Sequence, residues 1–194
     1  MPASVNITQR TGTDLSNPLP ARPVYSGSDS SHHLGKLTPT AEAGLDFDWV
    51  HTRCDFNALQ DEWNALFARS GQGSQVFQTF GWCWHWCNAF LPANNHETED
   101  CELAVLTARK HGQLVLVFPL VRKKSAGLME LKWLGDPVTQ YGDVLVDAEN
   151  TNEKLKLLQA AWDFVLQESQ ADLVFLRKVR AETVVGEVIA QSAT

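Results

Sequence analysis

The apolar residues of this chain follow two regular patterns from residue 47 onward. In four stretches they recur every three or four positions, which is the spacing of one buried face of a helix. We expect helices at 56–69, at 79–90, in the segment after Asn150, and at 182–191. Asn150 and Glu153 have the spacing of a capping box, which places the start of the third helix.

The second pattern consists of short runs that alternate apolar and polar residues or are almost wholly apolar, and it predicts strands. These runs cover 47–53, 101–108, 114–121, 128–134, 141–146 and 172–176. The run 114–121 has the composition of a central strand covered on both faces, and Pro119 predicts a bulge or a strand end within it. The resulting order is β-α-α-β-β-β-α-β-α, with an additional short strand at 141–146. This order predicts an α/β fold, a mixed sheet with helices on its faces.

Residues 1–46 show neither pattern and are rich in Ser, Thr, Pro and Gly. A segment of this composition cannot bury enough apolar surface to offset the entropy lost on ordering. We therefore expect a disordered tail over 1–46 and one folded domain over 47–194.

Composition narrows the classes of partner. The net charge of −7 disfavours non-specific binding to nucleic acid or anionic lipid. A membrane span needs ~20 apolar residues, whereas the longest apolar run, 114–121, is short and contains Pro119. The N-terminus also lacks the basic and apolar pattern of a signal peptide, so we expect a cytoplasmic protein whose cysteines are thiols.

Two groups of residues are candidates for chemistry, and each has a plainer alternative. Trp82 and Trp86 stand four positions apart on one helix face, where they either line a groove for a sugar or acyl chain or pack in the core. The polar segment that contains Gln140, Tyr141 and Asp143 lies between strands, where it either lines a cleft or forms a turn. In a cleft, Asp143 would serve as a base or a hydrogen-bond acceptor and Tyr141 as an acid.

The cysteines give no comparable signal. Cys83, His85 and Cys87 suggest a zinc site at first sight, but on a helix His85 points away from the face that the two cysteines share. No second pair of ligands with zinc spacing occurs in the sequence. We therefore interpret these cysteines as buried thiols, and we assign neither a metal nor a catalytic residue.

Several short blocks of the sequence resemble a known family when they are taken in order. The blocks are 63–67, 76–80, 82–86, 114–120, 133–135 and 141–145. Together they are similar to the CelD/BcsL-like proteins, FemAB-related members of the GNAT superfamily of acyltransferases that are named for cellulose biosynthesis. The resemblance covers about residues 47–180. It implies a GNAT-like fold and an N-acyltransferase that uses acetyl-CoA or another acyl-CoA and acts on a polysaccharide or cell-envelope precursor.

The chain departs from that family where the cofactor would bind. GNAT enzymes hold the cofactor's pyrophosphate on a glycine-rich turn at a helix N-terminus, where free N–H groups attract phosphate. The corresponding turn, 146–150, has no glycine and carries Asp147 and Glu149. The resemblance also implies two GNAT-like halves, of which this chain matches the first. We therefore expect no acyl-CoA to bind this chain alone, and a second half or a protein partner to complete it. The alternative function is a non-catalytic interaction or substrate-recognition module.

Overall fold

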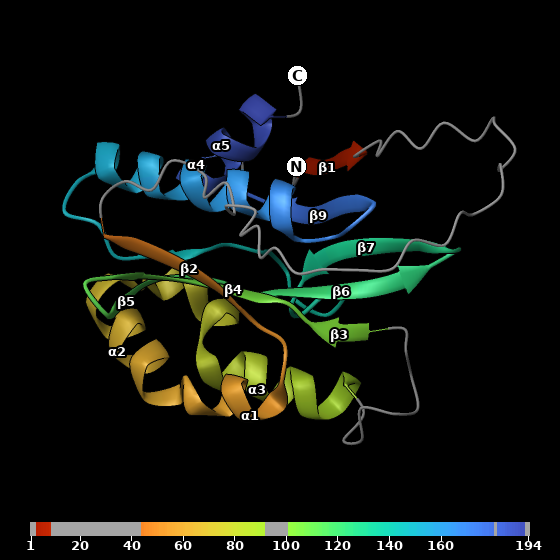
Figure 1. Cartoon of the computed structure of the whole chain (residues 1–194), viewed down its shortest axis with the longest axis horizontal. Coiled ribbons are helices and arrows are strands. Elements are labelled where there is room, and N and C mark those ends of the chain that lie inside the picture. Colours follow the sequence, from red (N-terminus) through yellow and green to blue (C-terminus); the bar gives the residue numbers. More distant parts are fainter. Residues whose placement is uncertain (1–2, 9–43, 92–100, 181, 193–194) are drawn as a thin grey trace, which may run out of the picture.

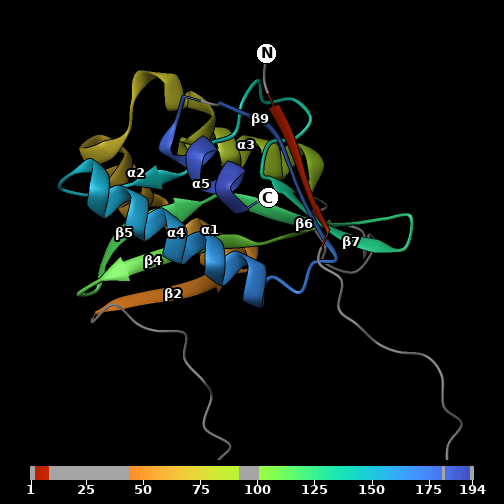
Figure 2. The same cartoon turned by 90° about the horizontal axis from the view of Figure 1, so that it is seen from above.

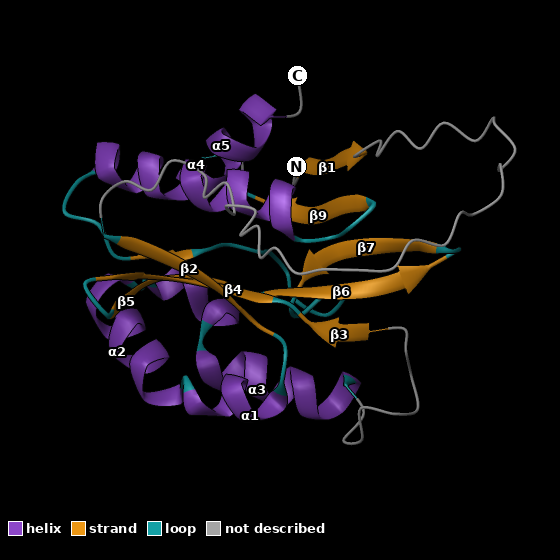
Figure 3. Ribbon diagram, in the orientation of Figure 1, coloured by secondary structure: helices purple, strands orange, loops and turns teal. Residues whose placement is uncertain are grey.

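A computed structural model describes residues 3–8, 44–91, 101–180 and 182–192 of the chain (Figure 1). Within these ranges the strands form a layer that has helices on both sides (Figure 3). The predicted class, a mixed α/β fold, is therefore confirmed.

The strands form two hydrogen-bonded groups, in the orders β2-β4-β5-β8 and β1-β9-β7-β6-β3. Every pairing is antiparallel except that of β7 with β9, which is parallel. Their bounds are β1 Ala3–Thr8, β2 Leu45–Val50, β3 Cys101–Leu103, β4 Val105–Lys110, β5 Gln113–Phe118, β6 Leu120–Ser125, β7 Leu128–Trp133, β8 Leu145–Val146 and β9 Leu173–Val179.

The two groups of strands share chain segments. β3 continues into β4 through Ala104, and β5 continues into β6 through Pro119. The amide N of Ala104 donates a hydrogen bond to the carbonyl O of Leu120 at 3.1 Å, which bridges the two interruptions. The interruption predicted at Pro119 is confirmed, since proline has no N–H to offer a neighbouring strand.

The helices divide between the two faces of the strand layer, with α1, α2 and α3 on one side and α4 and α5 on the other (Figure 1), so that α4 and α5 lie in front when the molecule is seen from above (Figure 2). The predicted helix at 56–69 is in fact two helices that meet at Leu59. No described helix combines the length and apolar character that a bilayer crossing requires. The bounds are α1 Arg53–Ala58, α2 Gln60–Ser70, the 3₁₀ helix η1 Gly73–Gln78, α3 Phe80–Phe90, α4 Thr151–Glu168 and α5 Val184–Ser192.

Strand β5 lies at the centre of the packing, as its composition predicts. Leu116 and Phe118 belong to the core cluster that includes α4 and α5, whereas Leu114 and Val117 belong to the cluster that includes α1, α2 and α3. Because β5 is buried on both faces, the side chains of its near-continuous apolar sequence pack into both hydrophobic clusters.

Helix α4 follows its sequence pattern closely. The side chain of Asn150 caps it by accepting a hydrogen bond from the amide N of Glu153 at 3.0 Å. Leu158, Trp162 and Val165 then form the buried stripe against the sheet. This helix joins β8 to β9, so it fixes where the parallel strand β9 returns to the sheet.

The N-terminal region differs from the sequence-based expectation at two places. Residues 3–8 form β1, which pairs antiparallel with β9, although disorder was expected there. β2 begins at Leu45, so the folded domain starts slightly before residue 47. The alternation of Val5 and Ile7 with polar residues suits a strand, but a run this short is a weak signal without its neighbour. Residues 9–43 lie outside the described residues.

Candidate functional site

The polar residues predicted as a site belong to a connection between β7 and β8, residues 134–144, which we call the 134–144 segment. Strands β7 and β9 are paired only at Glu130 with Leu173 and at Leu131 with Val174. Farther along β9, the 134–144 segment takes the place of β7, because Gly142 forms a parallel bridge with Val179. The segment therefore lies where two parallel strands separate.

Side chains of β9 hold the 134–144 segment against the sheet. Arg177 donates two hydrogen bonds to the carboxylate of Asp136, at 2.7 and 3.0 Å. The Nζ of Lys178 donates to the carbonyl oxygens of Thr139 at 2.6 Å and Pro137 at 3.0 Å. The ammonium group of Lys178 thus satisfies two carbonyl groups of the segment that have no partner in a regular strand pairing.

A glycine brings the end of the segment close to the sheet. A Cβ at Gly142 would lie 2.2 Å from Cε2 of the Trp133 ring, so only a residue without a side chain fits. Trp133 is itself 3% exposed and packs against Phe118. The position of Gly142 therefore fixes its two neighbours, Tyr141 and Asp143, on either side of a buried contact.

Asp143 is buried, with 6% of its surface exposed, and both of its carboxylate oxygens accept hydrogen bonds. Nε2 of Gln75 donates to Oδ2 at 2.9 Å, and the amide N of Val144 donates to Oδ1 at 2.8 Å. Burial raises the pKa of Asp143 above its ordinary value, although these two donors and the more distant charges of Lys154 and Arg180 oppose the shift. A buried carboxyl with a raised pKa is a feature that clusters at functional sites.

Tyr141 joins a group of aromatic rings that we call the aromatic cluster, formed by Phe77, Trp82 and Tyr141. The Phe77 ring meets both Tyr141 and Trp82 edge to face, with 4.9 Å between ring centroids in each pair. All three rings are only partly buried. The guanidinium of Arg180 lies 5.5 Å from the centroid of the Tyr141 ring, which adds a cation beside the cluster.

Two glutamines of η1 connect the aromatic cluster to Asp143. Gln75 bonds the Asp143 carboxylate, and Nε2 of Gln78 donates to the carbonyl O of Tyr141 at 3.4 Å. Both glutamines are buried, with 4% and 2% of their surfaces exposed. Neither glutamine stands out in the sequence, although two glutamines three residues apart on a short 3₁₀ turn share a face. A pair of buried polar side chains on one turn is the signal that could have revealed them.

The other two predicted site residues lie elsewhere. Trp86 is 6% exposed and packs in the core cluster of α1, α2 and α3, with its ring stacked on Phe90 at 5.2 Å. The side chain of Gln140 is exposed. The structure thus brings Trp82, Tyr141 and Asp143 together, while Trp86 has the surroundings of a core residue.

The thiols of α3 are buried, as expected. Burial raises the pKa of Cys87 to about 11, and it raises the pKa of Cys83 as well. Among the residues that the structure describes, no three His, Cys, Asp or Glu side chains are grouped to hold a metal ion. These thiols are therefore packed as small apolar groups.

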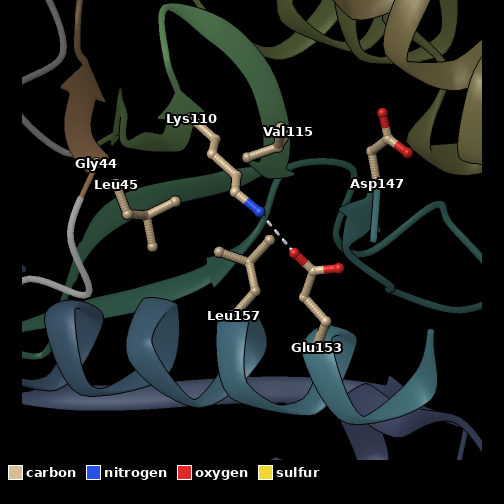
Figure 4. A pocket seen from close by; sticks show the side chains of 7 residues that line it. All are labelled: Gly44, Leu45, Lys110, Val115, Asp147, Glu153 and Leu157. Atoms are coloured by element: carbon tan, nitrogen blue, oxygen red, sulfur yellow. Dashed lines mark hydrogen bonds and ion pairs between the residues drawn. The ribbon is translucent and has the colours of Figure 1, made fainter. Parts of the chain in front are cut away.

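The turn that leads into α4 is occupied by the protein's own side chains. One carboxylate oxygen of Glu153 accepts from the amide N of Glu149 at 2.9 Å, and the other pairs with Nζ of Lys110 at 2.7 Å. Asp147 pairs with Arg69 at 2.8 Å. A small hollow beside this turn is lined by Gly44, Leu45, Lys110, Val115, Asp147, Glu153 and Leu157 (Figure 4). A phosphate at this helix N-terminus would have to displace Glu153 and would face Asp147.

No family model, no curated protein and no solved structure matches this chain. The class of protein rests on the observed architecture, which is a mixed α/β fold with helices on both faces of its strands.

Proposed function

We propose that this chain recognises the acceptor for an acyltransferase of the GNAT superfamily, and that the acceptor is a polysaccharide or a cell-envelope precursor. The observation that carries the proposal is the partly exposed aromatic cluster, which is tied to a buried carboxyl through Gln75 and Gln78. The element order from β2 to α5, with parallel strands β7 and β9 joined through α4, supports the superfamily assignment.

The aromatic cluster suits a sugar ring. The apolar face of a pyranose packs against flat aromatic surface, and the cluster offers three rings, with Phe77 in contact with both Trp82 and Tyr141. Binding sites for small molecules are mainly apolar, with a few polar groups that fix orientation. Arg180, beside the Tyr141 ring, is such a group and would favour an acceptor that carries a negative charge.

Asp143 acts in this proposal as a positioning residue. Its two oxygens are engaged by Gln75 and Val144, so it holds η1 against the 134–144 segment. Phe77 belongs to η1 and Tyr141 belongs to the 134–144 segment, so this link sets the distance between their rings. Of the two roles that the sequence suggests for Asp143, the hydrogen-bond acceptor is the better supported.

The acyl-CoA would be held outside this chain, by a second half of the protein or by a partner. At the N-terminus of α4, Glu153 and Asn150 already satisfy backbone amides that a phosphate would need. Asp147 and Glu149 would add repulsion between like charges. In isothermal titration with acetyl-CoA, we expect no heat of binding to this chain, and micromolar binding would overturn this part of the proposal.

Acceptor recognition is tested by titrating the chain with cellotetraose while following tryptophan fluorescence. We expect saturable quenching by the wild type. Tyr141→Ala and Phe77→Ala should each lower the affinity for cellotetraose at least tenfold, because each substitution removes one ring of the cluster. Phe90→Ala is the matched control, since Phe90 is an aromatic side chain that is 50% exposed but stacks on Trp86 instead. Equal affinities for all four proteins would contradict the proposal.

A second function, a non-catalytic interaction module, is favoured by exposed apolar side chains. Val76, Phe90, Leu128 and Val138 are each between 47% and 50% exposed. Each of these side chains offers apolar surface that a protein partner could cover. Size-exclusion chromatography with light scattering distinguishes the two functions, because a strictly monomeric chain that binds cellotetraose favours acceptor recognition.

A further inference from the structure

Arg180 places a cation beside the aromatic cluster. It directly follows β9, and its guanidinium carbon lies over the Tyr141 ring, 5.5 Å from the ring centroid. The attraction between a cation and an aromatic face acts on the charge of the guanidinium. It therefore holds Arg180 at the cluster while the N–H groups of the guanidinium remain available to an anion.

The backbone on both sides of Arg180 is fixed. The preceding residue, Val179, is buried and forms the parallel bridge with Gly142. The carbonyl O of Arg180 accepts hydrogen bonds from Oγ1 of Thr183 at 2.7 Å and from the amide N of the same residue at 3.2 Å. Because Gly142 adjoins Tyr141 in the sequence, the bridge to Val179 also sets the position of the Tyr141 ring relative to Arg180.

The charge of Arg180 is only weakly paired within the protein. Among the residues that the structure describes, the single hydrogen bond of its side chain runs from Nε to a carboxylate oxygen of Glu182 at 3.4 Å. The side chain of Glu182 is 72% exposed, and solvent screening leaves such ion pairs little net stabilisation. An anion that approaches the cluster therefore competes with a weakly held carboxylate.

The contact with Glu182 indicates which kind of anion Arg180 accepts. The partner is a carboxylate, and it is held by one hydrogen bond that is longer than the usual ~2.7–2.9 Å of a charge-assisted bond. A carboxylate that engages two nitrogens of the planar guanidinium forms a bidentate pair, which is stronger and more directional. A ligand carboxylate that binds in this way would displace Glu182.

On the basis of the proposed function, we propose that the acceptor is an acidic sugar. One of its rings packs against the aromatic cluster, and the carboxylate of that ring pairs with Arg180 in place of Glu182. The distance between Arg180 and the centroid of the Tyr141 ring, 5.5 Å, is close to the breadth of one pyranose, so both contacts can come from a single uronic acid residue. Arg180 then determines specificity, because it distinguishes a uronate from a neutral sugar.

The first test compares two tetrasaccharides by quenching of tryptophan fluorescence. One is cellotetraose, and the other is its tetraglucuronate, in which every C6 hydroxymethyl group is a carboxylate. Each ring of the tetraglucuronate carries the group, so the result does not depend on which ring lies on the cluster. At an ionic strength of ~0.15 M, screening limits the repulsion from the net charge of −7.

We expect the wild type to bind the tetraglucuronate about tenfold more tightly than cellotetraose, because bonds between ionised partners are the stronger ones. Equal affinities would overturn the acidic acceptor and leave the recognition of a polysaccharide in place. Binding of neither tetrasaccharide would overturn both.

Two substitutions should change the preference in opposite directions. Arg180→Gln removes the cation, so we expect the two affinities to become nearly equal. Glu182→Gln removes the competing carboxylate, so the affinity for the tetraglucuronate should rise severalfold. Because Glu182 is largely exposed, its substitution does not depend on the folding of a variant that lacks Arg180.

Lys124→Gln is the matched control for net charge. Lys124 is exposed on β6 and pairs with Met129, which lies near the start of β9, whereas Arg180 follows its end. We expect this variant to keep the wild-type preference. The inference is overturned if Lys124→Gln lowers the preference as much as Arg180→Gln, if Arg180→Gln leaves it unchanged, or if Glu182→Gln does not raise the affinity.

A phosphorylated sugar is the other anion that a guanidinium binds, and a third ligand distinguishes it. Cellotetraose phosphorylated at C6 presents nearly two negative charges on each phosphate, whereas the site offers the one guanidinium that holds a carboxylate in this structure. We expect the phosphorylated tetrasaccharide to bind less tightly than the tetraglucuronate. Tighter binding of the phosphorylated ligand would overturn the assignment of a carboxylate.

Discussion

The two connections that flank β8 use carboxylates in opposite ways. The 134–144 segment precedes this two-residue strand and buries Asp143, whose partners are neutral amide groups. The turn 147–150 follows it, and there the carboxylates stay at the surface, where Asp147 pairs with Arg69 and the nearby Glu153 pairs with Lys110. Asp143 is part of the packing, whereas Asp147 and Glu153 belong to a network of surface charges.

The difference shows in the direction of the pKa shifts. Burial raises the pKa of Asp143. The hydrogen bond from Lys110 and that from the amide of Glu149 lower the pKa of Glu153. Proton binding therefore favours the folded state at one connection and opposes it at the other. Position relative to the core, rather than residue type, therefore decides what a carboxylate contributes here.

The largest effect is expected from Gly142→Ala in the 134–144 segment. The added methyl group would overlap the buried, rigid Trp133 ring, which cannot move aside as a flexible side chain could, so the cost should reach or exceed the upper end of the ~1–3 kcal/mol that overpacking typically takes. Urea unfolding measures the loss. Gly81→Ala in α3 is the control, because a Cβ there meets nothing within 4 Å and alanine favours a helix. If both substitutions had the same effect, the 134–144 segment would not be part of the packing.

A smaller loss is expected from Asp143→Asn. The amide NH₂ of asparagine would face the donor Nε2 of Gln75, and leaving a buried donor without its partner costs roughly 1–3 kcal/mol. Gln75→Glu in the same chain should restore part of the stability, because a carboxylate at position 75 accepts from the new amide. Additive losses in the double variant would show that the two side chains are not coupled.

Asp143→Asn also tests the direction in which Asp143 makes the free energy of unfolding depend on pH. A carboxyl whose folded pKa is raised destabilises the protein as pH rises from its ordinary value of 3.8 towards the folded value. Replacing Asp143 with asparagine should remove this decline. Free energies of unfolding measured at several pH values above 3.8 would show it as a flatter profile, and an unchanged profile would exclude Asp143 as its source.

The smallest effect is expected from Glu153→Gln at the second connection. The pair with Lys110 is exposed to solvent, where screening leaves ion pairs little net stabilisation. Because the pKa of Glu153 is lowered, its contribution is present above the ordinary value of 4.5 and is lost as pH falls through the folded value. The pH slope should therefore have the opposite sign to that of Asp143. Urea unfolding measures the change in stability. If Glu153→Gln lost as much stability as Asp143→Asn, the two carboxylates would not differ in the way proposed.

The sequence predicts the parts of this molecule that depend on local pattern. The buried strand β5, the interruption at Pro119 and the cap of α4 at Asn150 follow from apolar period and residue chemistry. The order of elements and the mixed α/β class follow from them in turn.

Local sequence patterns do not predict contacts between segments that are far apart in the chain. Gln75 reaches Asp143 across 68 positions of the sequence, and Arg180 reaches Tyr141 from the residue that follows β9. No periodicity links a glutamine to one particular carboxylate, so the pairing depends on tertiary packing alone. For β1 the limiting factor is its length, because six residues become a strand only when β9 offers its edge.

The buried thiols of α3 also have a practical consequence. Cys83 and Cys87 lie in the packing between the helices and the sheet with raised pKa values, whereas Cys54 is at the surface. An alkylating reagent attacks thiolates, so modification of the two buried sulfurs requires this layer to separate. The rate at which Cys83 and Cys87 are alkylated in the native protein therefore reports how often that interface opens. Mass spectrometry measures this rate from the added mass of the reagent, without a label introduced by mutation.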